Sequence, residues 1–472
     1  MATHSIGTPA QLRDPDYMPP LHQAIPLGIQ HVLAMFVSNV TVAIIVAGAA
    51  GFGFGSDQAA AGFPDLTYMI QMSMLFAGVA TLLQTIGAGP VGARLPIVQG
   101  TSFAFIPVMI PLVAGKGVEA MAMITCGVLA GGLFHAALGR VIGRIRFALP
   151  PLVTGLVVLM IGLALVRVGI QYSAGGVPRI GTPEYGNAQS WSIALVVILV
   201  TLGVKFYARG MWAVAAVLIG LLAGYAYAWL LGVVSFTPVE RADWLAVPQP
   251  LRFGFEFSVA AVIGFCLMAF VSAIETVGDV AGITRGGAGR DATDREITGA
   301  TYADGFGSAL AGLFGALPNT SFSQNVGLIA MTGVMSRHVA TIGALFLILC
   351  GFVPKIGAVV ASVPIEVLGG GVVVMFGMVC AAGINMLSDV LWNRRNMVIF
   401  AVALSVGFGL QLEPGALQHL PDTPRVLLST GLLPAALIAI VLNLLLPREL
   451  AAEATEEVAG GMQGQGKGLK TD

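Results

Sequence analysis

The chain has 472 residues, of which 56% are hydrophobic and only 10% are charged, and its mean hydropathy is +0.88. Soluble domains carry about 25% charged residues, so a chain this long with so few charges belongs in a lipid bilayer. The net charge of −1 and the lack of basic blocks argue against nucleic acid as a partner. The four cysteines lie in apolar segments without paired spacing, and they predict neither a disulfide framework nor a metal site.

Residues 1–23 lack the basic start and apolar core of a signal peptide, and we expect them to form a cytoplasmic tail. From there on, apolar stretches recur, and at about 20 residues per crossing they predict fourteen transmembrane segments. We expect these segments at residues 24–50, 66–87, 94–114, 118–138, 148–168, 190–208, 212–234, 257–279, 297–316, 319–335, 339–353, 364–387, 396–411 and 426–446. The third and tenth are interrupted by polar residues, and the eleventh is short enough to be tilted or re-entrant. Residues 448–472 are rich in Glu and Gly and predict a disordered cytoplasmic tail.

The distribution of Lys and Arg predicts the orientation of the chain. These residues gather in the tails and in the connections that follow even-numbered segments, which places both termini in the cytoplasm. The long connection at 235–256 divides the chain into a first half at 24–234 and a second half at 235–447. Because seven crossings is an odd number, the second half enters the bilayer from the opposite side. The sequence therefore predicts an all-α polytopic membrane protein with a 7+7 inverted repeat.

Residues 317–333 carry Pro, Asn, Thr, Ser and Gln between two apolar runs. In hydrocarbon, broken backbone and polar side chains persist only where they face protein or a water-filled cavity. The pattern predicts a short extended segment followed by a half-helix that Ser321 or Ser323 caps, with its positive end facing a polar ligand. The alternative is an ordinary loop outside the membrane.

The sequence Thr-Ser-Phe occurs at 101–103 and again at 320–322, about half the chain apart. Each copy follows a proline and leads into an apolar segment. Matching interruptions in the two halves indicate paired broken helices that meet at a binding site. We expect two short antiparallel β-strands near the bilayer centre, each followed by a half-helix.

Residues 324–333 match the signature of the nucleobase–ascorbate transporter family: Gln or Glu, Asn, any residue, Gly, four further residues, Thr, and then Arg, Lys or Gly. Other features of that family follow the same order, with Gln30 and His31 in the first segment, Glu275 in the eighth and Asp304 in the ninth. The chain therefore resembles this family over almost its whole length. The resemblance implies a core domain of segments 1–4 and 8–11 and a gate domain of segments 5–7 and 12–14, through which the family dimerises.

Glu275 and Asp304 are acids inside apolar segments, where an unpartnered carboxylate costs roughly 2.5–3.5 kcal/mol at the helix centre. Each is either a functional group or an acid that ties helices together. For Asp304 the sequence favours a coupling role, because an acid that only paired helices would be expected to have a basic partner and no Lys or Arg lies near mid-segment. Asp279, one turn beyond Glu275, is expected to be solvated or to pair helices.

A carboxylate at Glu275 suits a heterocycle with adjacent N–H donors, and the carboxamide of Gln324 suits the amide edge of a purine. Phe103 either stacks on the base or simply packs, and His31 either touches the ligand or bonds between helices. The family resemblance assigns Glu275 and Gln324 to the base, with Phe103 nearby. The candidate substrate-binding residues are Glu275, Gln324, Phe103, Ser323 and Ser102; the candidate coupling or supporting residues are Asp304, Asn325, His31, Gln30 and Thr332.

We interpret the chain as a permease of a bacterial inner membrane that takes up a purine with a proton by alternating access, without a cofactor and without catalytic or metal-binding residues. The Gln and Gly at the ends of the signature resemble the xanthine and urate group of the family. A uracil or broad nucleobase permease is the first alternative, and an anion transporter or channel of the same fold is the second. An intramembrane enzyme is a remote third, because no nucleophile–base pair emerges.

Overall fold

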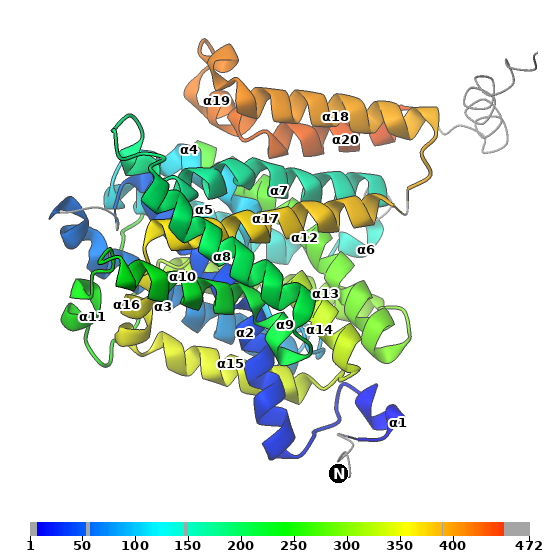
Figure 1. Ribbon diagram of the computed structural model, residues 1–472. Helices are drawn as coiled ribbons and strands as arrows, with labels where there is room; N and C mark the ends of the chain where they lie inside the picture. Colours follow the sequence, from blue (N-terminus) through cyan, green and yellow to red (C-terminus); the bar gives the residue numbers. More distant parts are fainter. Residues whose placement is uncertain (1–6, 53–56, 146–149, 389, 448–472) are drawn as a thin grey trace, which may run out of the picture. The chain divides into compact units, whose positions relative to one another are not determined.

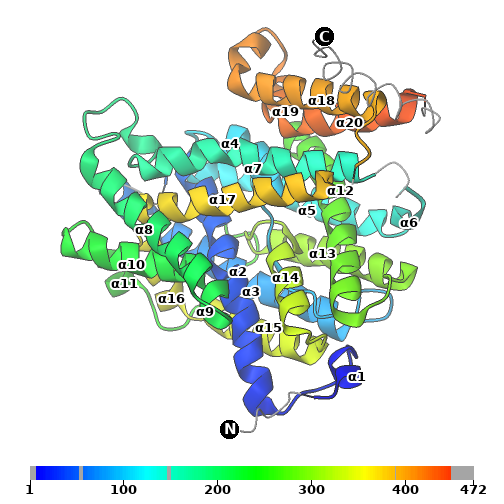
Figure 2. The same cartoon turned by 45° about the vertical axis from the view of Figure 1, so that its right-hand side comes forward.

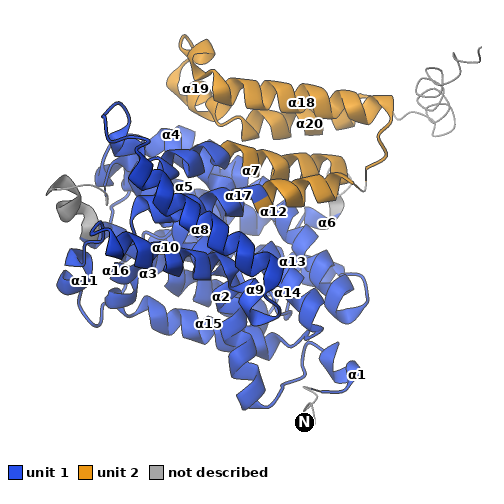
Figure 3. Ribbon diagram, viewed as in Figure 1, with its two compact units in different colours: residues 1–144, 165–377 blue, residues 145–164, 378–472 orange. Residues whose placement is uncertain are grey.

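A computed structural model of the chain describes residues 7–52, 57–145, 150–388 and 390–447. The chain divides into two compact units, shown in Figure 3. The first unit consists of residues 1–144 and 165–377, and the second of residues 145–164 and 378–472. The expected tail at 448–472 lies outside the described residues, as do residues 1–6 of the expected N-terminal tail. The predicted division into core and gate domains stays a prediction.

The described part of the chain is almost entirely helical (Figures 1 and 2). The helices within the first unit are α1 (Pro9–Leu12), α2 (Leu21–Ala50), α3 (Asp57–Ile86), α4 (Ile106–Val113), α5 (Met121–Leu138), α8 (Ala188–Tyr207), α9 (Met211–Val214), α10 (Ala216–Leu230), α11 (Thr237–Arg241), α12 (Val259–Ile283), α13 (Asp294–Leu313), α14 (Ser323–Thr332), α15 (Arg337–Gly351) and α16 (Pro354–Ala361). The boundaries between the units fall in α6 (Ile142–Ile145), α7 (Pro151–Ser173) and α17 (Ile365–Leu387), and the second unit continues with α18 (Arg394–Leu412), α19 (Asp422–Ser429) and α20 (Leu432–Leu445).

Each of the fourteen predicted segments overlaps a helix of the structure, although the third and tenth segments are helical only in their later parts. Among the described residues, eight helices are long and apolar enough to cross a bilayer, or ten if each of two bent pairs counts as one crossing. One bent pair is α15 with α16, at 82°, which agrees with the irregular eleventh segment. The third, seventh, ninth and tenth segments are too short or too polar to meet this criterion. The number of crossings therefore stays a prediction.

Two short strands lie where the sequence predicts the interruptions. Strand β1 (Gln99–Thr101) pairs antiparallel with β2 (Asn319–Ser321), and Gly100 is opposite Thr320 at the centre of the pair. A 3₁₀ turn and α4 follow β1, and α14 follows β2. The prediction of two antiparallel strands with half-helices is confirmed, and residues 317–333 are not an ordinary loop. The depth of the pair in the bilayer stays a prediction.

The helices around the two strands pack in the same way in both halves: the first long helix of each half contacts its own strand and half-helix, and the second packs on a helix of the other half. Helix α2 contacts β1 and α4, while α12 contacts β2 and α14; α3 packs on α15, while α13 packs on α5. Both helix–helix contacts are close. A Cβ on Gly78 of α3 would lie 2.6 Å from the carbonyl oxygen of Ala344, and a Cβ on Gly305 of α13 would lie 2.2 Å from the amide nitrogen of Ala136. This exchange is what an inverted repeat produces, and it favours that prediction.

Helices α8 and α10 lie side by side in Figures 1 and 2 and approach through Gly220, where a Cβ would lie 2.9 Å from the carbonyl oxygen of Val197. Their other faces expose large apolar side chains, among them Leu199, Leu222 and Trp229. Exposed apolar helix faces of this kind suit contact with lipid.

Candidate functional site

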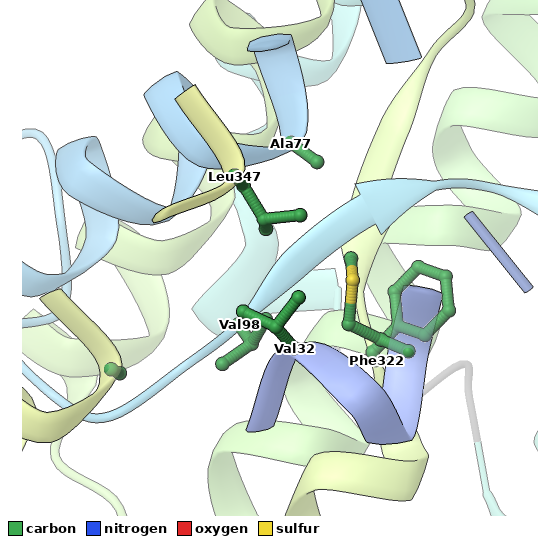
Figure 4. Close-up of a cluster of buried hydrophobic side chains, with 7 residues drawn as sticks. Val32, Ala77, Val98, Phe322 and Leu347 are labelled. Atoms are coloured by element: carbon green, nitrogen blue, oxygen red, sulfur yellow. The ribbon is translucent and has the colours of Figure 1, made fainter. Parts of the chain in front are cut away.

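The two strands cross against a small apolar cluster. The cluster contains Val32 and Met35 of α2, Ala77 of α3, Val98, Phe322, Ala340 and Leu347. Figure 4 shows Val98, Phe322 and Val32 close together beside the crossing strands. At Gly100 a Cβ would lie 2.4 Å from the Phe322 ring and 2.6 Å from the methyl group of Met35. A larger residue at this position would require the Phe322 and Met35 side chains to shift.

Strand β1 is anchored by side chains of α2 and α3. The Gln99 amide donates to Thr81 Oγ1 at 2.9 Å. Asn39 Oδ1 accepts from the Thr101 amide at 2.8 Å and from the Thr101 hydroxyl at 3.0 Å. Asn39 Nδ2 in turn donates to the Ser73 carbonyl of α3 at 3.1 Å. These buried bonds satisfy the polar backbone of a strand that has only one neighbouring strand.

Strand β2 is anchored by α12 and α13. The Asn319 amide donates to Ser308 Oγ at 2.9 Å, and that hydroxyl donates to the Asn319 carbonyl at 3.1 Å. Ser272 of α12 donates to Thr320 Oγ1 at 3.0 Å. Each strand is therefore held by the two long helices of its own half.

The two half-helices begin differently. Ser102 caps the 3₁₀ turn at Phe103–Phe105, accepting from the Ala104 amide at 3.3 Å. The predicted capping of α14 by Ser321 or Ser323 is wrong, because the N-cap residue is Phe322 and no side chain caps the helix. The reason is position, because Ser321 is the last residue of β2 and Ser323 is already the first residue of α14.

Ser321 donates to Asp279 Oδ2 at 2.6 Å, and Ser323 donates to Asp279 Oδ1 at 2.7 Å. Asp279 is buried rather than solvated, and it joins α12 to β2 and α14. Of the two expectations for this acid, helix pairing is the one that the structure supports.

Asp304 is completely buried and accepts three hydrogen bonds. Gln84 Nε2 donates to Oδ1 at 2.8 Å, Gln99 Nε2 donates to the same oxygen, and the Thr276 hydroxyl donates to Oδ2. The carboxylate therefore ties α13 to α3, β1 and α12 through neutral donors. Its burial means that it does not touch a ligand directly in this conformation.

Sequence reasoning missed Gln84 and Gln99 as partners of Asp304. Both are carboxamides close to or within apolar segments, where an unpaired polar group is costly. This cost is a signal that the sequence carries. A buried acid without a basic neighbour needs neutral hydrogen-bond donors, and buried carboxamides can supply them. The sequence alone does not show which donors come within reach.

Glu275 and Gln324 are the polar groups that remain accessible near the start of α14. Glu275 precedes Asp279 by one helical turn, so the two carboxylates share a face of α12. Glu275 is half-buried, Gln324 is exposed, and no hydrogen bond from the described residues reaches either side chain. Ser323 is exposed apart from its bond to Asp279. The structure thus brings Asp279, Ser323 and Gln324 to one helix start, with Glu275 on the face of α12 that carries Asp279.

Phe103 is half-buried and packs edge-to-face on Phe376 of α17, with 5.2 Å between ring centroids and 84° between planes. The packing alternative for this ring therefore has direct support. The ring is still partly exposed, which leaves room for a second contact.

His31 bonds between helices. Asn325 Nδ2 lies 2.9 Å from His31 Nδ1 and donates to the His31 carbonyl at 3.1 Å. Because Asn325 Nδ2 is a donor, His31 Nδ1 acts as the acceptor in this arrangement. Gln30 and His31 are both buried in α2. Their position suits a supporting role rather than direct contact with a ligand.

A comparison of the sequence with protein families settles the classification. The profile described as the permease family, which covers xanthine and uric acid permeases, matches residues 22–415. The chain belongs to the nucleobase–ascorbate transporter family. The resemblance predicted from the signature is confirmed.

Two relatives of this permease are 34% identical to it. The uric acid permease PucJ of Bacillus subtilis aligns over 91% of the chain and 95% of its own length. The xanthine permease XanP of Escherichia coli aligns over 91% of the chain and 93% of its own length. Among solved structures, the transmembrane domain of a cyanobacterial bicarbonate transporter, BicA, matches with a TM-score of 0.57 and 16% identity, covering 90% of the chain and 97% of that domain. This match shows a common fold, and with the apolar helices it makes the permease a multi-pass membrane protein.

The family signature, residues 324–333, runs from the second residue of α14 to the glycine that ends the helix. Asn325 bonds to α2, as described above, and the Thr332 hydroxyl donates to the Leu328 carbonyl at 2.9 Å in the last turn. Gly333 follows with φ +68°, the left-handed conformation that ends many helices. Nothing in the structure explains the glycine at 327, where a Cβ would have no neighbour within 4 Å.

Proposed function

We propose that this permease imports a purine nucleobase, xanthine and/or urate, together with a proton, across the inner membrane of a bacterium. The observation that carries the proposal is a pair of accessible polar side chains to which no described residue makes a hydrogen bond: Gln324 in the first turn of α14, and Glu275 on α12, one turn before the Asp279 that bonds to Ser323. The names of the relatives, a uric acid permease and a xanthine permease, support a purine as the substrate.

Each proposed contact has a chemical reason. The Glu275 carboxylate accepts hydrogen bonds from adjacent ring N–H groups, and the Gln324 carboxamide donates one bond and accepts another. Ser323 gives its hydrogen to Asp279, so its oxygen serves a ligand only as an acceptor. Phe103 from the first half completes the proposed site with its partly exposed ring available for stacking, and the buried Ser102 caps the turn that carries this ring.

Proton coupling and alternating access belong to the same proposal. Glu275, Asp304 and His31 are the titratable groups that we propose as proton carriers, alongside Asp279, which bonds to Ser321 of β2. We propose that the core, built around the two strands, moves against the gate helices and carries the site from one side to the other. We further propose that two copies associate through the gate domain, and that both termini face the cytoplasm.

The proposal is tested by uptake of radiolabelled xanthine into cells that express the permease and lack other purine carriers. We expect unlabelled xanthine and urate to compete, uracil and sulfate to compete poorly, and a protonophore to abolish accumulation. A Glu275→Gln variant of equal membrane abundance is the control. Competition by uracil as strong as by xanthine would favour a broad nucleobase permease.

An anion transporter is the second candidate function, because a bicarbonate transporter shares the fold. Anion carriers of this kind would favour an arginine or a bare helix N-terminus at the site. The carboxylate of Asp279 beside the start of α14, with Glu275 one turn before it on α12, disfavours that function. Sulfate or bicarbonate uptake without purine uptake would nevertheless decide for it.

A further inference from the structure

The carboxylate of Asp279 lies beside the start of α14 without capping it, because no side chain accepts from the first N–H groups of that helix. Its two oxygens accept from Ser321 and Ser323, the residues on either side of the N-cap residue Phe322. An ionised carboxylate is an acceptor at both oxygens, so the two serines give each oxygen of the charged form one hydrogen bond. These bonds stabilise a negative charge beside the beginning of α14.

That charge opposes the electrostatic effect of the helix itself. Helix α14 has 10 residues and no side-chain cap. The first N–H groups of such a helix lack partners, and they carry the positive end of its dipole. A bare N-terminus attracts anions. With Asp279 held against it by two serines, the start of α14 loses this attraction.

No basic residue balances the acids around the strands. Glu275 lies one turn before Asp279, Asp304 lies in α13, and the buried titratable group of α2 is His31, which bonds to Asn325. Arg285, in the turn after α12 that packs on α14, pairs with Asp291 instead. Lys and Arg do not occur in residues 21–86, 95–113, 259–284 or 317–336, which include α2, both strands, both half-helices and α12. A ligand at the start of α14 therefore meets carboxylates without a compensating guanidinium or ammonium group.

We propose that Asp279 determines the charge of the purine that this site accepts, by discriminating against anionic ligands. The inference rests on the proposed function and adds a substrate property to it. At neutral pH urate is mostly a monoanion, whereas xanthine is mostly neutral. The two bases offer similar hydrogen-bonding edges, so the charge of Asp279 acts on the ratio of their affinities more than on either affinity alone.

The experiment measures binding of xanthine and urate to the purified full-length permease at neutral pH. The readout is the Kd of urate divided by the Kd of xanthine. In Asp279→Asn we expect this ratio to fall about tenfold, the effect of removing one nearby charge at intermediate dielectric. Asp279→Glu keeps the charge, and Ser321→Ala removes one hydrogen bond but keeps the carboxylate, so both should preserve the wild-type ratio.

A merely structural role for Asp279 predicts a different result, in which both affinities weaken together and the ratio stays constant. If Asp279→Asn does not fold, Asp279→Ser supplies a second neutral variant that retains a hydroxyl for the two serines. A wild-type ratio in the neutral variants overturns the inference alone. A wild-type protein that binds neither purine overturns the proposed function, and this inference with it.

Discussion

The half of the site built on β1 and the half built on β2 share their anchors but differ in charge. In α3, Gly78 approaches α15, and Thr81 one turn further accepts the first amide of β1. In α13, Gly305 approaches α5, and Ser308 one turn further accepts the first amide of β2. The same spacing performs the same two tasks in both halves.

The residues just before these glycines show where the halves diverge. Ala77 precedes Gly78 and lies in the apolar cluster around Phe322. Asp304 precedes Gly305 and accepts bonds from Gln84, Gln99 and Thr276. An apolar position in one half is thus a buried acid in the other. The anchors of the two strands are equivalent in the two halves. The carboxylates of the site lie only in the second half and are therefore not part of this symmetry.

Of the variants that test this difference between the two halves, a substitution of Asp304 is expected to change transport the most. If the acid couples transport to protons, Asp304→Asn abolishes accumulation of substrate while the purified protein still binds it, because Glu275 and Gln324 are intact. Uptake, binding and thermal melting are measured on one preparation. A purely structural acid would instead lower the melting temperature and abundance, with the remaining protein accumulating normally. Loss of binding at normal stability would place Asp304 against the substrate and contradict both roles.

The next largest effect concerns Glu275, which no described residue bonds. Glu275→Gln replaces one acceptor oxygen by a donor, which then opposes a purine N–H. We expect binding to weaken by about 2 kcal/mol, the range for a hydrogen bond to a charged group, with the melting temperature unchanged. Gln324→Glu is the companion variant and should shift preference among bases, since it removes a donor and keeps acceptors. Unchanged affinity in Glu275→Gln for every substrate would move the site elsewhere.

A smaller effect, on stability, is expected from a substitution at Gly100, at the centre of the strand pair. A Cβ at Gly100 would meet the Phe322 ring and the Met35 methyl group within 2.6 Å, so Gly100→Ala should destabilise the permease by roughly 1–3 kcal/mol through overpacking. Gly327→Ala is the matched control, because its Cβ would have no neighbour within 4 Å. Thermal melting in detergent compares the two. Equal melting temperatures would mean that the strands separate easily.

The sequence predicted much of this architecture because apolar segments and polar interruptions are local signals. The repeated Thr-Ser-Phe pointed to both strands, although the first copy overlaps β1 only at Thr101. The two copies are one residue out of step with the anchors, because Gln99 and Asn319 are bound in the same way and this relates Thr101 to Ser321 rather than to Thr320. A one-residue shift exchanges the two faces of a strand, so sequence identity alone did not show which hydroxyl does what.

The partners of the buried acids were beyond sequence reasoning for a related reason. Asp304 meets Gln84 and Gln99, which are far away along the chain, and Asp279 meets serines that looked like helix caps. Such contacts depend on which helices cross, and a single sequence does not specify the crossings. Glu275 and Gln324 were easier to find, because the signature and the cost of an intramembrane acid identify them locally.

The smallest expected effect tests whether the two anchors are equivalent. Thr81→Val and Ser308→Ala each remove the acceptor of a strand's first amide, and a buried N–H without a partner costs about 1–3 kcal/mol. Both hydroxyls also donate a bond, from Thr81 to the Ala77 carbonyl at 2.7 Å and from Ser308 to the Asn319 carbonyl at 3.1 Å. Because each variant loses two bonds, we expect similar falls in melting temperature and little change in the ratio of urate to xanthine affinity. A large loss in one variant alone would show that one strand carries the crossing. In the double variant, additive losses would mean that the anchors act independently, whereas a smaller combined loss would mean that releasing either strand already frees the other.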